Sequence, residues 1–348
     1  MNSINPGGAT NVLGPVDWVT LALDRVSTDK TVVLAMITEK AGSTPRDTGA
    51  WILVDHEEAF GTLGGGQLEK MVEEEARKLL CSSVGAYRSI IRYVLGPDAN
   101  QCCGGTVALA LELLDARAAT WLEKAQKSLE TSPDNAILFP TNDPNAPPRI
   151  ITMSSSISVT TGTHLQSLHD PRPWLFLFGA GHVGRSICNI ASQLPLRLVA
   201  LDQRNAMRAL VPPARNVTVI DMVDSDIGTN QIPDGAAALV MTHSHELDYL
   251  LCRALLEKPG LIFIGLIGSH SKAARFRHRF RRDGVDPLLI SNLTSPIGEN
   301  NLSSKEPGVI ALSTLTEIMI AFENTNFEKH AKLQFPSGLI LEKKGQIQ

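Results

Sequence analysis

The feature that most constrains the fold is a glycine-rich loop, GAGHVG, which follows an apolar run at residues 174–178 and opens a helical pattern at residues 183–194. Gly179 permits a tight turn, Gly181 lets the backbone approach a phosphate, and Gly184 lets the helix pack closely on the strand. The free amides at the start of such a helix favour an anion. The loop therefore predicts a Rossmann-type module in the C-terminal half of the chain.

The segments that follow this loop have the same alternating rhythm. Apolar runs alternate with helical patterns, which is typical of a doubly wound parallel sheet with helices on both faces. Asp202 ends the second run, about 20 residues after the loop, where an acidic residue would meet a ribose 2′-hydroxyl. We expect a domain of residues 173–326, with strands at 174–178, 198–201, 217–220, 237–241 and 261–267.

Histidines are expected at the carboxyl edge of this sheet. His182 lies inside the glycine loop, and His243 and His245 follow the fourth strand. If the ligand were NAD(P) used for hydride transfer, such a histidine would be placed to act as a general acid. A lone loop histidine is as often simply solvated. A pair spaced i, i+2 also lacks a third metal ligand, so we assign no structural metal to these histidines.

The N-terminal half has a different pattern, in which strands outnumber helices. This composition predicts a mixed α+β domain of residues 15–160. A stretch rich in Pro, Asn, Ser and Thr at 131–163 contains two weak strands, and we expect a linker at 161–172. Residues 1–14 and 327–348 are predicted to be a flexible N-terminus and a polar tail. The strand patterns lie at 31–37, 50–54, 60–63, 89–95, 106–113, 136–139 and 149–153, and the helical patterns at 16–26 and 67–80.

An adjacent cysteine pair, Cys102-Cys103, lies between Gln101 and the glycines Gly104 and Gly105. Adjacent cysteines rarely bridge each other, because the small ring strains the intervening peptide. The glycines would let backbone amides point inward and stabilise a thiolate, which is the form that binds a metal or attacks sulfur. The alternative is a pair of small apolar side chains at a strand entrance. We favour a functional role for this pair, whereas Cys81, Cys188 and Cys252 lie in helical patterns and are expected to be core or bystander residues.

Two other loops of the N-terminal half carry groups suited to a polar ligand. A run of three glycines before a helix forms a possible anion nest of backbone amides. A second loop offers hydroxyls and a guanidinium to a phosphate or a polar ring. Each loop alone fits a tight turn with a solvated arginine, but three such loops in one small domain favour a shared pocket. The residues are Gly64, Gly65 and Gly66 in the first loop and Ser43, Thr44 and Arg46 in the second.

Composition narrows the classes of partner. The formal net charge of −4 gives no basic footprint, so we expect no nucleic acid. No apolar run reaches the roughly 20 residues needed to span a bilayer, so we expect no membrane. The first residues lack the pattern of a signal peptide, and the odd cysteine count suits a reducing compartment, so we expect a cytoplasmic protein.

Taken in order, these motifs resemble the XdhC/CoxI family, the accessory proteins for xanthine dehydrogenase and related molybdenum hydroxylases. The resemblance implies a two-domain chaperone that is not itself an enzyme. Such proteins bind the molybdenum cofactor (molybdopterin), hold it while its sulfido ligand is added, and deliver it to the apo-enzyme. The matching stretches are GSTPRDTGAWILV (42–54), GTLGGGQLE (61–69), LGPDANQCCGGTV (95–107), LFGAGHVGR (177–185), THSHELD (242–248), IGLIGSHSKAARF (264–276) and LTSPIG (293–298).

The resemblance also implies partners and ligands. A thiolate of Cys102 or Cys103 would contact molybdenum, and the glycine loops would hold the terminal phosphate of the pterin. The implied partners are the molybdenum-binding subunit of xanthine dehydrogenase, a cysteine desulfurase and a second copy of the chain. The basic segment 272–282 is a candidate contact surface, or else a solvated helix face.

This sequence departs from the family in places. Many relatives carry a cysteine at the position of Ser295 and an acidic residue at the position of Ser244. Two other functions stay open: an NAD(P)-dependent oxidoreductase that uses the Rossmann domain, and a nucleotide-sensing regulatory module.

Overall fold

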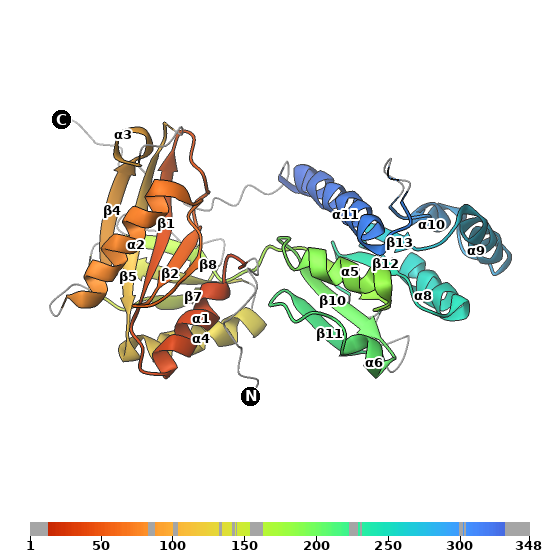
Figure 1. Ribbon diagram of the computed structural model, residues 1–348, viewed down its shortest axis with the longest axis horizontal. Helices are drawn as coiled ribbons and strands as arrows, with labels where there is room; N and C mark the ends of the chain where they lie inside the picture. The colour runs from red at the N-terminus through yellow and green to blue at the C-terminus, as the bar shows by residue number, and fades with distance from the viewer. Residues whose placement is uncertain are drawn as a thin grey trace. The chain divides into compact units, whose positions relative to one another are not determined.

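The computed structural model describes residues 13–82, 88–99, 104–131, 134–140, 143, 145–153, 163–222, 229, 232–298, 302 and 304–330. The chain divides into two compact units, one of residues Leu13–Pro171 and one that begins at Arg172 (Figure 1). We describe each unit by itself. Among the described helices, none is both long enough and apolar enough to cross a membrane.

The N-terminal domain is built on a five-stranded antiparallel sheet in the order β3-β2-β1-β5-β4. The central strand β1 is buried on both faces, because Val33, Ala35 and Ile37 enter one core while Leu34 and Met36 enter the other. This alternation follows from the two-residue period of a strand. The strands are β1 (Val32–Ala41), β2 (Trp51–Val54), β3 (Ala59–Gly61), β4 (Arg88–Val94) and β5 (Thr106–Leu114).

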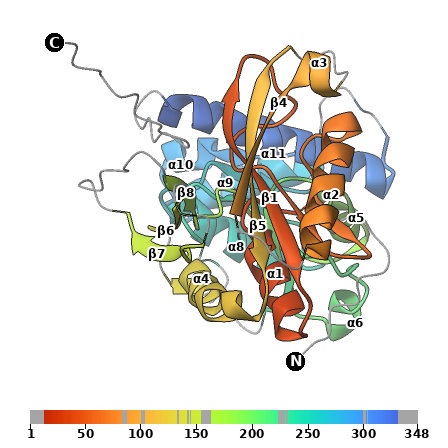
Figure 2. The ribbon, with the colours of Figure 1, turned by 90° about the vertical axis from the view of Figure 1, so that its left-hand side faces the viewer.

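Helices cover both faces of this sheet (Figure 2). Helix α2 (Gly66–Cys81) packs its buried residues Leu68, Val72 and Ala76 on one face. Helices α1 (Asp17–Ser27) and α4 (Ala119–Thr131) pack on the other face, where Trp18 and Trp121 share a core with the second sheet. Short helical turns are α3 (Leu95–Ala99) and η1 (Ala116–Ala118).

A second, three-stranded antiparallel sheet in the order β7-β6-β8 completes this domain. Its strands are β6 (Asn135–Pro140), β7 (Arg149–Thr152) and β8 (Thr163–Ser167). Strand β8 lies inside the segment 161–172 that we expected to be a linker, and α4 was not predicted. The sequence of β8 is polar, so its strand character depends on pairing with β6, in which Leu165 lies opposite Leu138.

The C-terminal domain is a six-stranded parallel sheet in the order β11-β10-β9-β12-β13-β14. In chain order this is 3-2-1-4-5-6, the strand order of a Rossmann fold. The predicted doubly wound parallel sheet is therefore confirmed. The strands are β9 (Trp174–Phe178), β10 (Arg197–Asp202), β11 (Val217–Asp221), β12 (Ala237–Val240), β13 (Phe263–Leu266) and β14 (Leu293–Thr294), of which only β14 was not predicted.

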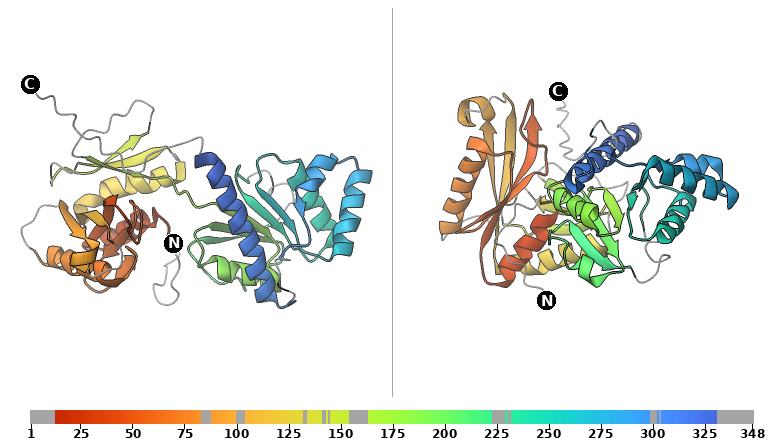
Figure 3. Two further views of the ribbon diagram at one scale, coloured as in Figure 1. Left: turned by 90° about the horizontal axis from the view of Figure 1, so that it is seen from above. Right: turned by 45° about the vertical axis from the view of Figure 1, so that its right-hand side comes forward.

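Helices lie on both faces of the parallel sheet (Figure 3). Helices α5 (His182–Ala191) and α11 (Pro307–His330) share one core, in which Ile187 and Leu315 are buried. Helices α8 (His245–Glu257), α9 (His270–Arg282) and α10 (Pro287–Ser291) contribute to the core of the opposite face, and α6 (Asn205–Arg208) follows β10. Helix α11 extends past residue 326, where we had placed the end of the domain.

Candidate functional site

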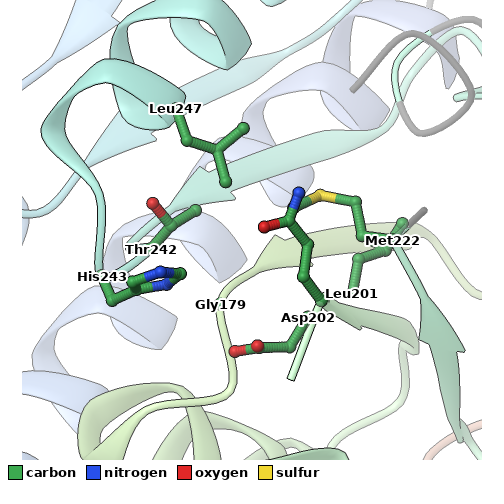
Figure 4. A pocket seen from close by; sticks show the side chains of 8 residues that line it. Gly179, Leu201, Asp202, Met222, Thr242, His243 and Leu247 are labelled. Carbon is green, nitrogen blue, oxygen red and sulfur yellow. The ribbon is translucent and has the colours of Figure 1, made fainter. Parts of the chain in front are cut away.

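A depression lies at the carboxyl edge of the parallel sheet, where the strand order reverses. Strand β9 pairs with β10 on one side and β12 on the other, and connections that leave in opposite directions open a crevice at this point. The depression holds about 170 Å³, space open to solvent included. This space holds no enclosed volume the size of a water molecule, so the depression is a shallow indentation beside the glycine loop and not an enclosed pocket. Its lining residues are Gly179, Leu201, Asp202, Gln203, Met222, Thr242, His243 and Leu247 (Figure 4).

The glycines of the loop have separate structural roles. Gly179 has φ +115°, and a Cβ there would lie 2.4 Å from the Met241 carbonyl oxygen. A Cβ on Gly184 would lie 2.1 Å from the Gly179 carbonyl oxygen. At Gly181 a Cβ would meet no atom within 4 Å, so the backbone there borders open space. The first and third glycines therefore serve packing, whereas the second leaves room for a ligand.

The N-terminus of helix α5 follows directly from this loop. Gly181 is the N-cap residue and supplies no side-chain cap, and His182 begins the helix with an exposed side chain. The amides of the first turn keep no intrahelical acceptor and carry the positive end of the helix dipole. These amides could hold a phosphate, and the phosphate site at this loop stays a prediction.

Asp202, at the end of β10, is hydrogen-bonded by other residues of this domain. Its carboxylate accepts hydrogen bonds from the Ala180 amide at 2.7 Å, from the Arg204 amide and Nε at 2.9 Å each, and from Arg204 Nη2 at 2.8 Å. Burial raises the pKa of Asp202, but the bonds from Arg204 and Ala180 outweigh it and lower the pKa to about 2. The carboxylate is thus not free to accept from a ribose hydroxyl, contrary to our expectation.

The predicted histidines are separated by the structure. His243 lines the depression, whereas His245 is the first residue of α8 and has an exposed side chain. Among the described residues, no group of three or more His, Cys, Asp or Glu side chains is arranged to hold a metal ion. His243 therefore remains the histidine with access to a ligand in the depression.

A buried ion pair that the sequence did not reveal braces the loop carrying His243. Asp248 accepts hydrogen bonds from the amide and Oγ1 of Thr242, at 2.9 and 2.7 Å. Its other carboxylate oxygen accepts from Lys272 Nζ at 2.7 Å, and Lys272 also donates to the Ile267 carbonyl at 3.0 Å. The side chains of Lys272 and Asp248 are 9% and 1% exposed. The pair therefore ties together the carboxyl ends of β12 and β13.

Fewer basic side chains of segment 272–282 are available to a partner than we expected, because several bond to groups of their own domain. Lys272 is buried, and Arg277 donates to the carbonyls of Leu293 and Ser295. Arg279 pairs with Glu246, and Arg282 pairs with Asp283. The proposed contact surface on α9 is thus reduced, because most of its cations serve the fold of the C-terminal domain.

In the N-terminal domain, three glycine-bearing loops contact one another. The Gly105 amide donates to the Ser43 carbonyl at 3.1 Å. A Cβ on Gly105 would lie 2.3 Å from that same oxygen, and a Cβ on Gly64 would lie 2.6 Å from Cβ of Pro45. The loop at 42–46 therefore lies against both the loop at 64–66 and the loop at 104–105, and we call these three the N-terminal loop cluster.

The expected anion nest in this cluster is filled by the chain itself. Glu69 Oε2 accepts from the amides of Leu63 and Gly65, at 2.8 and 3.1 Å, and from Thr62 Oγ1 at 2.7 Å. The Glu69 carboxylate thus accepts from the Gly65 amide, which we had assigned to an external anion. The Gly64 amide donates to Thr62 Oγ1 instead. The Gly66 amide begins α2.

The other predicted residues of this cluster divide into two groups. Thr44 Oγ1 donates to the Arg46 carbonyl, so its hydroxyl serves the loop. The side chains of Ser43 and Arg46 are exposed, and a Cβ on Gly65 or Gly104 would meet no atom within 4 Å. Gln101, Cys102 and Cys103 lie outside the described residues.

The other cysteines lie in helices, as expected. Cys188 and Cys252 are buried, and Cys81 is exposed at the end of α2. Burial raises the pKa of the Cys188 thiol to about 12 and raises the pKa of Cys252 as well, so both stay protonated.

Comparison with protein families identifies the chain. The XdhC and CoxI family matches residues 26–93, and the XdhC Rossmann domain matches residues 175–318. Together these matches cover more than half of the chain and fall in both domains. The chain belongs to the XdhC/CoxI family. Its depression and its glycine loop therefore lie in the XdhC Rossmann domain, and the β1–β4 region lies in the XdhC and CoxI part.

Individual relatives extend over both domains. An uncharacterized protein of Escherichia coli, YqeB, is 24% identical over 88% of this chain and 46% of its own length. The chain thus spans about half the length of that relative. A protein of Bacillus subtilis, described as a probable subunit of xanthine dehydrogenase, is 26% identical over 82% of this chain and 92% of its own. A crystal structure described as a xanthine dehydrogenase from Bacillus halodurans shares the fold, with a TM-score of 0.68, 21% identity and coverage of 93% and 99% of the two chains.

Proposed function

We propose that this chain is an accessory protein of xanthine dehydrogenase that binds the molybdenum cofactor. It holds the cofactor during sulfuration and delivers it to the apo-enzyme, without oxidoreductase activity of its own. The observation that carries the proposal is the N-terminal loop cluster, in which Gly105, two residues after Cys103 in the sequence, packs on Ser43. Membership of the XdhC/CoxI family supports it.

The groups of the loop cluster fit a molybdopterin cargo. Its terminal phosphate suits the exposed guanidinium of Arg46 and the hydroxyl of Ser43. The open space beside Gly65 and Gly104 leaves backbone accessible to a ring. A thiolate from Cys102 or Cys103 is a soft ligand of the kind that binds a soft metal centre.

Delivery also requires protein partners. We propose that the chain contacts the molybdenum-binding subunit of xanthine dehydrogenase and a cysteine desulfurase that supplies the sulfur. We further propose that it works as a homodimer in the cytoplasm. Co-purification with each partner, and the mass of the free protein in solution, test these proposals separately.

A second proposal concerns the C-terminal domain. A shallow depression lies beside the glycine loop, and the first turn of α5 offers amides to a phosphate. We propose that this domain holds a nucleotide, either as a sensor or as the cofactor of an oxidoreductase. Turnover of NADH or NADPH with a small carbonyl substrate would favour the oxidoreductase and contradict a purely accessory role.

Cofactor retention tests the first proposal. The purified full chain is mixed with molybdenum cofactor, passed through gel filtration and assayed for bound molybdenum. We expect about one molybdenum per chain in the wild type and a large loss in the Cys102→Ala/Cys103→Ala variant. Cys81→Ala is the matched control, because Cys81 is an exposed cysteine of the same domain, outside the loop cluster, and should retain the metal. Unchanged retention in the double variant would rule out the cysteine assignment, and no retention in the wild type would refute the cofactor-binding role.

A further inference from the structure

The end of strand β10 presents a cation to the ligand site in place of the usual acidic acceptor. A carboxylate has about four acceptor positions, and the four donors on Asp202 fill them. The Asp202 side chain is 4% exposed. A ribose hydroxyl would have to displace one of these charge-assisted bonds, which are stronger than bonds between neutral groups. Asp202 is therefore a poor ribose acceptor in this domain.

Arg204 has the opposite character. Its Nε and Nη2 bind Asp202, while Nη1 has no hydrogen-bond partner within the part of the chain that the structure describes. Its side chain is 37% exposed. Arg208, one turn later, is instead committed to the Asp202 carbonyl and to both carboxylate oxygens of Asp221. Arg204 is thus the more exposed guanidinium at this strand end, 37% against 16% for Arg208, and its Nη1 edge is left for a ligand.

A ligand in the depression would lie next to Asp202, which holds the Arg204 guanidinium. Met222 and Leu201 lie on one side of this shallow slot and Thr242, His243 and Leu247 on the other (Figure 4). Asp202 and Gln203 also line the slot. In a Rossmann domain the 5′-phosphate lies on the helix after the glycine loop, and the ribose lies at the end of the second strand. Here that strand is β10, so the ribose 2′ position falls next to the Asp202–Arg204 pair.

We propose that the C-terminal domain binds a nucleotide whose ribose carries a 2′-phosphate, and that Arg204 selects it. This proposal rests on the nucleotide site proposed above and names its ligand class. Asp202 holds the guanidinium in place, and the Nη1 edge donates to the 2′-phosphate. Because Arg204 neutralises Asp202, the phosphate does not meet an uncompensated carboxylate. A nucleotide with a free 2′-hydroxyl gains no such bond.

Calorimetric titration of the full chain tests the proposal with two probes, adenosine 5′-monophosphate and adenosine 2′,5′-bisphosphate, at one fixed ionic strength. A hydrogen bond to a charged group predicts that the bisphosphate binds between about ten- and a hundredfold tighter. Arg204→Met should remove this preference and bring both affinities to that of the monophosphate. Arg208→Met is the matched control, because it removes the same charge four residues later and should keep the preference.

The other outcomes overturn the proposal. Equal affinities in the wild type, tighter binding of the monophosphate, or binding of neither probe would each refute selection by Arg204. If Arg204→Met does not fold, Asp202→Asn/Arg204→Met removes both charges of the pair and carries the same prediction. Molybdenum retention is measured on the same preparations. Its failure refutes the accessory function alone, whereas absence of the nucleotide preference in the wild type, or its persistence in Arg204→Met, refutes the role of Arg204 alone.

Discussion

The buried pair of Lys272 and Asp248 supports a quantitative prediction. Replacing Lys272 by Met keeps an apolar stem of similar length but leaves the Asp248 carboxylate, 1% exposed, without its cation. Breaking a buried pair in this way costs about 3–5 kcal/mol. Asp248 keeps two hydrogen bonds from Thr242, so we expect the lower value, about 3 kcal/mol. For a domain of this size, that lowers Tm by roughly 6–12 °C.

Hydrogen exchange read by mass spectrometry on the full chain locates the effect. Peptides from β12 and α8, which flank Thr242, should lose about 10²-fold protection, because each 1.4 kcal/mol is a factor of ten in the opening equilibrium. Peptides from β1 and β5 belong to the other compact unit and serve as an internal reference. Thermal unfolding of the same samples gives the change in Tm.

An exposed ion pair in α8, the helix that carries Asp248, provides the control. Arg253 and Glu257 in α8 form an i,i+4 pair with side chains 43% and 51% exposed, so Arg253→Met should cost no more than about 0.5 kcal/mol. The double variant Lys272→Met/Asp248→Asn should be more stable than Lys272→Met, since it removes the unpaired charge. If Lys272→Met is no more destabilising than Arg253→Met, the argument from a buried ion pair is wrong.

Two other predictions concern the glycine loop and a partly buried histidine, His164. Gly184→Ala would put a Cβ 2.1 Å from the Gly179 carbonyl oxygen and should cost about 1–3 kcal/mol in thermal unfolding. Gly181→Ala, with no atom within 4 Å of its Cβ, should leave Tm unchanged and weaken nucleotide binding in the same titration. An equal effect of both variants on Tm would contradict these roles. Burial lowers the pKa of His164 to about 4 from 6.5, so the unfolded chain takes up this proton first as the pH falls. Stability is therefore full above pH 6.5 and declines towards pH 4, by about 3 kcal/mol in total. Urea unfolding followed by tryptophan fluorescence at pH 7 and pH 5 should show about 2 kcal/mol of this loss in the wild type and in the exposed-residue control His169→Phe. A wild-type pH dependence in His164→Phe would exclude this histidine as the cause.

The sequence by itself determined the elements whose pattern is local. Strands β9, β10, β12 and β13 are apolar runs that are largely buried. The turn after β9 needs glycine because neighbouring backbone leaves no room for a Cβ at Gly179 or Gly184. The side chains of β1 point to the two faces of the sheet in turn, and the buried residues of α2 lie four positions apart. Both patterns follow from the sequence spacing alone. Motif order in both halves was enough to indicate the family.

Only the tertiary structure decided which polar groups are free to act. Asp202 and Arg204 are close in sequence, but the hydrogen bond from the Ala180 amide to Asp202 depends on the turn after β9 lying beside the end of β10. From the sequence, Lys272 is one cation of the basic segment 272–282. In the structure it forms a buried ion pair with Asp248, 24 positions away. Strand β8 has a polar sequence and becomes a strand by pairing with β6. In each case the deciding partner is brought near by the fold, and a local pattern carries no information about a partner that lies elsewhere in the chain.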